Sequence, residues 1–440
     1  MNNKKIKLAV ASAVLSAASI ANAGIIIPAG DWTLDVNGNV NAFATWHNAD
    51  KDKGGKVVGG IAEREDVTGE GSTQSINTGL LPSWLGFTGT TRQNDVDVSF
   101  TISLQQSASD EAVTGDILMG HQRQAFVTFG DKSWGSVKLG KDLGLFAGQA
   151  ILNDMTLLGV GGGGAGTSGA RTTLGGIGSG YIYPAWKGQI AYTTPNMNGF
   201  TATIAITNPN QGFFGNASTT TTTTTTVTNP TSASGNGSFT STATTGVELY
   251  QDRFGVEGQL MYEWTGDVAG KVWASGASYD VTLSTNANTT SSTDDSYTAS
   301  VYDVGAAISA GNLGLVGYYY NGEGVGTTMM GGFTEFNGAY NNGTEFKKRD
   351  SDGGYVQATY VIPTGTKLGL AYGISKLDEA SGETDADLVE SNERWTVGAY
   401  HPLTKHLNLV AEYNKITSEG QSSAYENEND TFSLGAILFF

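Results

Sequence analysis

Cysteine is absent from the chain, so neither a disulfide nor a thiolate metal site can stabilise its fold. Proline is rare, with 8 residues among 440, whereas glycine occurs 62 times and tyrosine 18 times. This composition is typical of many strands joined by turns, and the frequent aromatic residues argue against disorder. Stability must therefore come from backbone hydrogen bonds and side-chain packing.

Long hydrophobic runs are also missing after the N-terminal region, where no stretch of about 18 apolar residues occurs. This excludes a transmembrane helix in the mature chain. Two classes remain, a secreted soluble β-protein and a transmembrane β-barrel, because only helices and closed barrels satisfy every backbone polar group within lipid.

The N-terminal residues have the three parts of a secretory signal: three lysines, an apolar stretch at 8–20 and the small-residue site Ala21-Asn22-Ala23. A membrane anchor is the alternative, but the apolar stretch is shorter than the roughly 20 residues that span a bilayer. We expect cleavage after Ala23, which makes residues 1–23 a signal peptide and residues 24–440 the mature domain.

Positive charge is scarce, with 24 lysines and arginines against 42 acidic residues. Removal of the signal peptide takes away three lysines and no acidic residue, so the mature charge is 21 − 42 = −21. A surface of this charge repels nucleic acid and anionic headgroups, so we expect no nucleic-acid partner.

What the mature chain does contain is a hydrophobic residue at every second position of many segments. Between Trp32 and Trp46 the even-numbered positions are mostly apolar and the odd-numbered ones mostly polar, which predicts a strand with two different faces. The pattern recurs at 96–104, 200–206, 256–264 and 368–374. Each segment has about the ten residues that a tilted strand needs to cross the hydrocarbon layer.

The connectors between the expected strands alternate in length. The tight links lie near 91–94, 130–134, 194–198, 266–270, 310–312, 363–366 and 401–405. The long ones span 47–79, 106–120, 142–186, 208–246, 280–296, 321–354, 375–393 and 416–430. Outer-membrane barrels have short periplasmic turns and long external loops, so we expect an all-β fold, a transmembrane antiparallel β-barrel of about 16 strands with both termini in the periplasm.

Two local features lie at the ends of these segments. Thr219–Thr226 is a run of eight threonines, which we expect in an external loop without chemistry. The aromatic residues Trp32, Trp46 and Tyr318–Tyr320 lie near expected strand ends, where girdles form at the level of the headgroups. Ordinary sheet aromatics are the alternative.

The last segment, Thr431 to Phe440, alternates up to an aromatic final residue and resembles the terminal signal for insertion of outer-membrane barrels. Further motifs are Trp84–Gly89, Arg123–Val127 leading into Gly135–Lys141, Tyr192 with Pro195 and Gly199-Phe200, and Leu403–Lys405. In their order and spacing, these motifs give the mature chain the layout of the trimeric general porins of Gram-negative outer membranes, which it resembles.

The resemblance implies a homotrimer in outer-membrane lipid that acts as a passive pore for small hydrophilic solutes and ions, with no cofactor. It also implies that the connector from Asp142 to Trp186 folds into the lumen as a constriction loop. In the family, carboxylates on this loop face basic residues on the wall. Opposed charges across a narrow passage create a transverse electric field, which discriminates between solutes by their polarity.

Several family positions differ in this chain. Trp84 and Ala191 stand where the family has wall arginines, and Leu157-Leu158-Gly159 replaces an expected acidic residue, although Asp154-Met155 matches. We therefore expect a constriction that is less charged and more aromatic than usual. Its candidate residues are Arg123, Trp84, Lys141, Asp142, Asp154, Arg171, Tyr181, Tyr183 and Trp186.

Arg123 raises a conflict between two lines of reasoning. Strict alternation would point it outward with Ala125, Val127 and Phe129, whereas the resemblance points it into the lumen. A charge facing lipid costs about 2–4 kcal/mol at the midplane, so we expect the lumen. A position among the headgroups is the alternative.

An enzymatic alternative is a barrel hydrolase with a histidine base. His47 and His121 are expected near the external rim and His401 and His406 beside a periplasmic turn, and no spacing brings a nucleophile to any of them, so solvated rim histidines are expected instead. The acidic runs at 378–390 and 419–430 lack the order of a calcium loop, and the glycines at 161–164 lack a following Gly-Lys-Ser/Thr. We expect neither an enzyme nor a metal site.

Two channel hypotheses remain open. The first is a general pore with a weak cation preference, based on the charge of −21 and the few wall arginines. The second is a channel specific for a neutral or aromatic solute, based on Trp84, Tyr181 and Tyr183.

Overall fold

The computed structural model describes residues 24–64, 71–108, 122–162, 172–208, 217–227, 237–250, 253–284, 296–328, 338–341 and 345–440. The expected signal peptide, His121 and Arg171 lie outside these residues.

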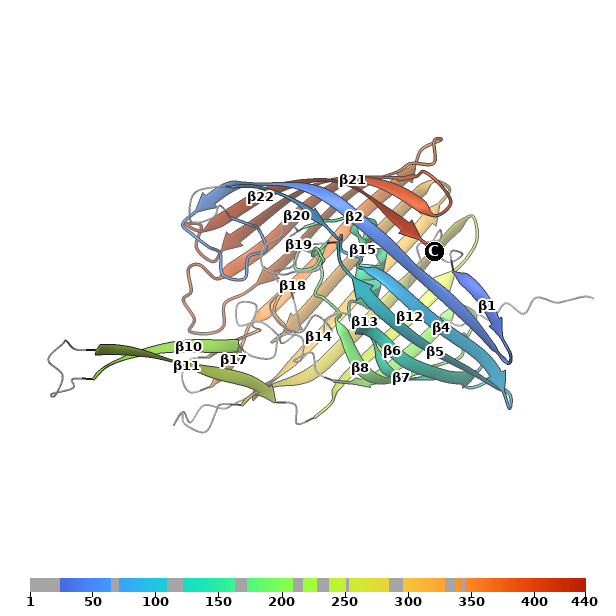
Figure 1. The fold of residues 1–440 in the computed structure, drawn as a ribbon, viewed down its shortest axis with the longest axis horizontal. Helices are drawn as coiled ribbons and strands as arrows, with labels where there is room; N and C mark the ends of the chain where they lie inside the picture. The colour runs from blue at the N-terminus through green and yellow to red at the C-terminus, as the bar shows by residue number, and fades with distance from the viewer. Residues whose placement is uncertain are drawn as a thin grey trace, which may run out of the picture.

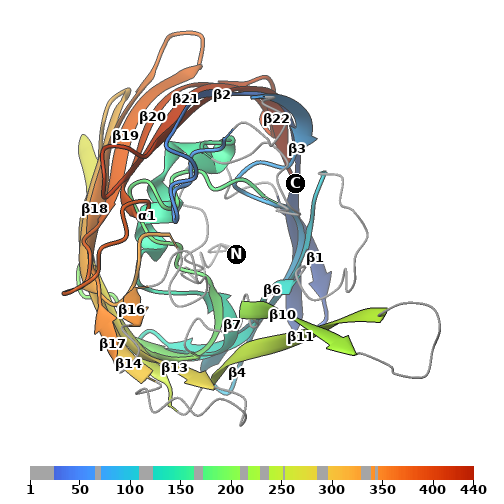
Figure 2. The same ribbon diagram turned by 90° about the vertical axis from the view of Figure 1, so that its left-hand side faces the viewer.

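Sixteen antiparallel strands close into a barrel, as expected from the alternation (Figures 1 and 2). Each strand pairs with the next in the ring, and β22 returns to β2 over most of its length. In order, the ring consists of β2 (Trp32–Lys53), β4 (Ser83–Gln93), β5 (Val96–Gln106), β6 (Gln122–Asp131), β7 (Gly135–Leu143), β8 (Trp186–Thr193), β9 (Phe200–Thr207), β12 (Gly255–Trp264), β13 (Val268–Ser284), β14 (Ser296–Ala310), β15 (Leu313–Glu323), β18 (Asp350–Val361), β19 (Lys367–Leu377), β20 (Val389–Pro402), β21 (Leu407–Gly420) and β22 (Glu426–Phe439).

The remaining elements are short or lie at the ends of the barrel. β1 (Ile25–Ala29) and β3 (Ser72–Asn77) pair with the two ends of β2, and β16 (Ala339–Asn341) pairs with β17 (Phe346–Lys348). The connector from β7 to β8 holds the helix α1 (Gly148–Asn153) and the 3-10 turn η2 (Met155–Leu158). Within the described part of the chain, neither of these nor any other helix has the length and apolar character needed to cross a membrane.

Two expectations about the connectors are wrong. The threonine run forms part of a strand, β10 (Ala217–Val227), which pairs along its whole length with β11 (Gly237–Tyr250) in a hairpin that projects from the long-loop end (Figure 1). Threonine has a β-branched side chain, which favours extended structure, and an argument from low complexity alone does not take this into account. The link expected at 416–430 is also short, because β21 and β22 pair out to Glu419 and Glu426.

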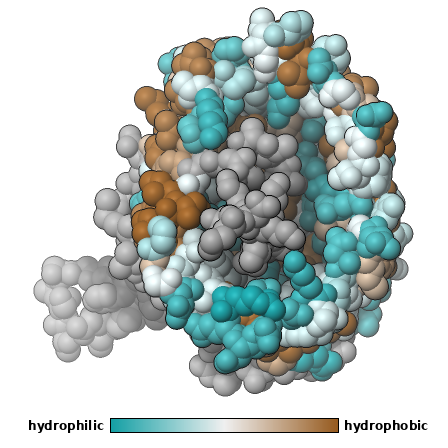
Figure 3. Space-filling view, turned by 90° about the vertical axis from the view of Figure 1, so that its right-hand side faces the viewer, coloured by the Kyte–Doolittle hydropathy of each residue, from teal (hydrophilic) through white to brown (hydrophobic). Residues whose placement is uncertain are grey.

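The outer surface of the barrel is apolar around the ring. Ile204 of β9, Leu260 of β12 and Val397 of β20 have 59%, 51% and 55% of their surfaces exposed, and their polar neighbours in sequence face the interior. Figure 3, which views the end with the short turns, shows hydrophilic residues along the inner side of the ring and hydrophobic ones outside. In water this arrangement would expose the apolar belt, so the belt must face lipid.

The tyrosine run in β15 departs from the girdle that the sequence predicts. Tyr319 faces outward with 43% of its surface exposed, whereas Tyr318 and Tyr320 face inward and are buried at 6% and 0%. Adjacent residues of a strand point to opposite faces, so three consecutive tyrosines cannot share one girdle.

Candidate functional site: the loop inside the barrel

The connector between β7 and β8 folds into the barrel and lies against its inner wall. Figure 2 shows α1 inside the ring beside β18, β19 and β20. The Tyr355 hydroxyl of β18 donates to the Ala150 carbonyl of α1 at 2.8 Å, and the Gly180 amide donates to the Ser375 hydroxyl of β19 at 2.9 Å. The expected constriction loop is therefore present, and it is attached along much of the wall.

Inward-facing carboxylates on the strands hold the first part of the loop through its backbone. Glu257 of β12 accepts hydrogen bonds from the Leu145 and Phe146 amides at 2.6 and 3.2 Å, and it forms a buried ion pair with Lys187. Asp303 of β14 accepts from the Ala147 amide at 2.9 Å. Because buried backbone amides need acceptors, these carboxylates satisfy a segment that has no strand partner.

The next part of the loop is held in the same way further along the same side of the ring. Glu412 of β21 accepts the Val160 and Gly161 amides, both at 2.8 Å, and the Tyr400 hydroxyl at 2.6 Å. Gln357 of β18 accepts the Met155 amide at 2.7 Å. The loop is therefore connected to a continuous arc of the wall that runs from β12 to β21.

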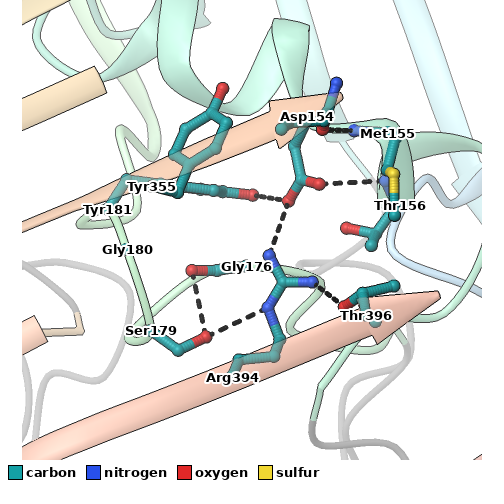
Figure 4. Close-up of polar contacts among 12 residues, drawn as sticks. Asp154, Met155, Thr156, Gly176, Ser179, Gly180, Tyr181, Tyr355, Arg394 and Thr396 are labelled. Atoms are coloured by element: carbon teal, nitrogen blue, oxygen red, sulfur yellow. Dashed lines mark hydrogen bonds and ion pairs between the residues drawn. The ribbon is translucent and has the colours of Figure 1, made fainter. Parts of the chain in front are cut away.

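A buried polar cluster around Asp154 fixes the middle of the loop (Figure 4). One Asp154 oxygen accepts from the Tyr181 hydroxyl at 2.9 Å and lies 3.8 Å from a terminal nitrogen of Arg394, and the other accepts the Thr156 amide at 2.9 Å. Both side chains of the ion pair are 1% exposed. Burial, with the Asp154 carboxylate adding to it, raises the pKa of Tyr181 well above its ordinary value, so the hydroxyl remains a donor.

Apolar packing surrounds these polar contacts. The loop residues Phe146 and Ile182, fully buried, pack with Trp273 of β13, Val301 of β14 and Tyr320 of β15 in one cluster. The inward faces of these strands are therefore apolar where the loop packs against them. This pattern explains why the inward parity of β13 does not read as polar in the sequence.

Gly176 offers a test of how tightly the cluster is packed. A Cβ atom at this position would lie 2.6 Å from an Asp154 oxygen and 2.7 Å from an Arg394 nitrogen. We expect Gly176→Ala to loosen the loop and to increase current noise in single-channel recordings. Gly148→Ala in α1 is the matched control, because its nearest neighbour would be at 4.0 Å. Equal noise in the two variants would contradict this packing.

The expected site residues on the strands occupy separate places. Trp84 faces inward, 6.3 Å from the Phe439 ring between centroids, and its indole nitrogen donates to Asn37 at 3.4 Å. Asp142 is buried. Its carboxylate accepts a hydrogen bond from the side-chain amide of Gln124 at 3.1 Å and another from the Lys138 ammonium. Lys141 pairs in register with Ala125, an outward-facing position, so its side chain starts from the outer face.

Arg123 lies at a β-bulge, which explains the conflict about its direction. The register between β5 and β6 shifts after Ile102. There the Arg123 backbone amide donates to the Gln105 side chain, and the Gln124 backbone amide donates to the Ser103 hydroxyl. An extra residue in one strand interrupts the alternation, so parity counted from Ala125 does not extend to Arg123. Its guanidinium lies 5.9 Å from the centre of the Trp186 ring.

The expected aromatic residues of the loop are packed inside it. Tyr181 is fully buried, with its ring centre 5.8 Å from that of Tyr355, and Tyr183 is 7% exposed. Neither ring therefore presents a free face to a passing solute. The structure brings Asp154 and Tyr181 together and places Arg123 over the Trp186 ring, whereas Trp84 and Asp142 lie at other points of the wall.

The residues that sequence reasoning missed are the wall anchors of the loop: Glu257, Asp303, Arg394 and Glu412. Each lies on the inward parity of an alternating strand, as Asp303 does between the outward-facing Tyr302 and Val304. A charged residue at such a position was the available signal.

The histidines differ from the expectation of solvated rim residues in one case. His47 is 4% exposed, and its Nε2 lies 3.1 Å from a Glu63 oxygen. His401 Nδ1 lies 2.9 Å from the Thr366 hydroxyl at the short-turn end, as expected of a turn residue. Among the described residues, no group of three His, Cys, Asp or Glu side chains could hold a metal ion.

Comparisons with known proteins agree with this geometry. The family model described as Gram-negative porin matches residues 9–329. The outer-membrane channel DcaP of Acinetobacter baumannii has a similar structure, with a TM-score of 0.63 and 15% identity over 95% of this chain and 100% of DcaP. Salmonella typhi OmpF, solved with daunomycin, has a TM-score of 0.56 and 17% identity over 94% of this chain and 100% of OmpF. No curated protein sequence matches the chain.

The chain belongs to the Gram-negative porin family. It is an outer-membrane protein that forms a channel, with a closed barrel of 16 strands and an internal loop.

Proposed function

We propose that the channel allows passive diffusion of small hydrophilic solutes and ions, with a weak preference for cations. The observation that carries this proposal is the polarity of the inner wall away from the loop: on strands such as β5 and β22, polar residues lie between the apolar outward ones, and a loop attached to one side narrows the space they enclose. Water and hydrated solutes can exchange hydrogen bonds with such a wall.

The preference for cations follows from the charge distribution. The mature chain, taken from Gly24, has a charge of −21, and the acidic side chains of Glu379 and Asp385 lie exposed at the long-loop end of the barrel. A negative mouth raises the local concentration of cations. The cationic side chains Lys138, Lys187 and Arg394 on the inner wall each have a carboxylate partner, so they add little attraction for anions.

Reversal potentials across planar bilayers in a potassium chloride gradient test the preference. We expect a potential whose sign shows potassium to be more permeant than chloride, and a smaller value at higher salt because ions screen the mouth. Neutralising Glu379 and Asp385 should reduce it further. Clear selectivity for chloride would overturn the proposed preference.

We also propose a homotrimer, residues 1–23 as a signal peptide, and no enzymatic activity. The assembly is supported by the resemblance to general porins and by a similar structure, Vibrio cholerae OmpT in a trimer form, which has a TM-score of 0.51 and 15% identity over 93% of this chain and 99% of OmpT. Mass measurement of the detergent-solubilised protein tests the trimer, and a monomer at all concentrations would contradict it.

A further inference from the structure

The constriction loop has almost no charge to present to a solute. Between residues 144 and 185 the chain has only two charged residues, Asp154 and Arg171. Asp154 is 3% exposed and paired with Arg394 and Tyr181, so its charge is neutralised inside the protein and is not presented to the lumen. The described part of the loop therefore has no exposed carboxylate.

The wall that faces the loop across the barrel is formed by β5 and β6. These strands lie half the ring away from β15 and β18, the second of which contacts the loop through Tyr355 and Gln357. Figure 2 shows α1 on one side of the ring and β6 and β7 on another. A solute that passes the loop must therefore move along this wall.

Hydroxyl groups in cross-strand pairs line the middle of that wall. Thr88 of β4 and Thr101 of β5 lie in register with their hydroxyls 3.1 Å apart, and Ser99 of β5 contacts Thr128 of β6 in the same way. Thr88 and Thr101 are half-buried on the face opposite to Ile102, which is 49% exposed to the outside. A third pair, Thr193 and Thr203, joins β8 and β9 at 3.0 Å.

Two lysines on the same arc of wall are paired with carboxylates, and Arg123 at the β6 bulge lies over the Trp186 ring. Lys138, which is in register with Thr128, forms an ion pair with Asp142, and Lys187 forms one with Glu257. With opposite charges paired on one wall, and Asp154 buried on the other side, little transverse field crosses the passage. A charged solute would gain nothing there to offset the loss of part of its water shell.

We propose that the passage selects for uncharged polyhydroxylated solutes, that is, sugars and sugar alcohols, with the hydroxyls of Thr88, Thr101 and Thr128 as the contacts. A hydroxyl both donates and accepts, so a row of them exchanges hydrogen bonds with the hydroxyls of a sugar at each step. This inference rests on the proposed diffusion function and names its solute class.

Three solutes of nearly equal size but different charge test the proposal, namely glucose, glucosamine and gluconate, in swelling assays with liposomes that contain the full protein. We expect glucose to enter fastest, with glucosamine ahead of gluconate only by the small factor that the acidic mouth provides. Entry of either charged solute faster than glucose would overturn the proposal.

Removal of two hydroxyls without change of shape gives a sharper test. The double variant Thr88→Val, Thr101→Val should slow glucose entry about fivefold, the effect of one lost hydrogen bond, and leave the potassium conductance unchanged. The matched control is Thr364→Val, Thr366→Val, which removes a hydroxyl pair 3.0 Å apart at a short turn. Equal glucose rates in both double variants would overturn the proposal.

The single variant Thr101→Asp tests whether solutes move along the wall formed by β5 and β6. A carboxylate there should slow gluconate more than glucose, and unchanged ratios would contradict the path. If potassium currents are present but none of the three solutes enters, the inference fails and the diffusion function for ions stands. If neither currents nor swelling is seen, the proposed function itself fails.

Discussion

Replacing Asp154 by alanine is expected to release the middle of the loop and to raise the single-channel conductance. The change leaves the Arg394 guanidinium, 1% exposed, without its carboxylate, and it removes the acceptor of the Tyr181 hydroxyl and the Thr156 amide. Loss of one partner from a buried pair costs about 3–5 kcal/mol, more than a loop segment can absorb without moving. The unpaired Arg394 guanidinium would then move toward water in the lumen and displace the loop.

The size of the largest neutral solute that blocks the current measures the effect. We expect this exclusion limit to rise in Asp154→Ala and to rise less in Asp154→Asn, which also removes the carboxylate from Arg394 but keeps an acceptor for the Thr156 amide. Asp385→Ala is the control for charge, because it removes a carboxylate from an exposed position. An unchanged exclusion limit in Asp154→Ala would show that the cluster does not hold the loop.

The second large effect is on the free energy of unfolding, and it is expected from comparing a lysine on the outer face of one strand with a lysine on its inner face. Ile204 and Thr203 are neighbours in β9, with Ile204 facing outward at 59% exposure and Thr203 facing inward beside Thr193. Ile204→Lys should lower the free energy of unfolding by about 2–4 kcal/mol, because it places a charge in the hydrocarbon layer. Thr203→Lys should have little effect, since the lumen supplies water.

Denaturant titrations of protein folded into lipid vesicles provide the measurement for this pair. The difference between the two neighbours is the informative quantity, because both variants add the same side chain to the same strand. Equal destabilisation would mean that β9 does not separate lipid from water.

Alternation and the lengths of the connectors predict the barrel and its strand number, since the period of two is set by strand geometry. The inward loop was expected from the resemblance to general porins. The rule of alternation fails at Arg123, where a bulge adds a residue that only the partner strand reveals. It also missed the extension of β21 and β22, whose polar residues, such as Glu428 and Asp430, pair as a strand beyond the apolar belt. Strand pairing above the membrane does not need apolar residues.

The contacts that anchor the loop could not be predicted from the sequence, for a different reason. Glu257 and Glu412 belong to strands far from the loop in sequence, and each accepts backbone amides, which every residue has. No residue pattern in the loop indicates such a partner. For Tyr181 and Tyr183, the sequence predicted aromatic rings in the constriction, but whether a ring faces the lumen or the wall depends on how the loop packs.

Single thiols in an otherwise cysteine-free chain test the central claim most directly. Because the protein has no cysteine, each of Thr101→Cys, Thr128→Cys and Thr203→Cys, and their neighbours Ile102→Cys, Val127→Cys and Ile204→Cys, contains one reactive group. With the protein in outer membranes, a small water-soluble maleimide should label the first three and leave the second three unlabelled. Labelling of both sets alike, or of the second set alone, would contradict a barrel with a watery interior and a lipid-facing exterior.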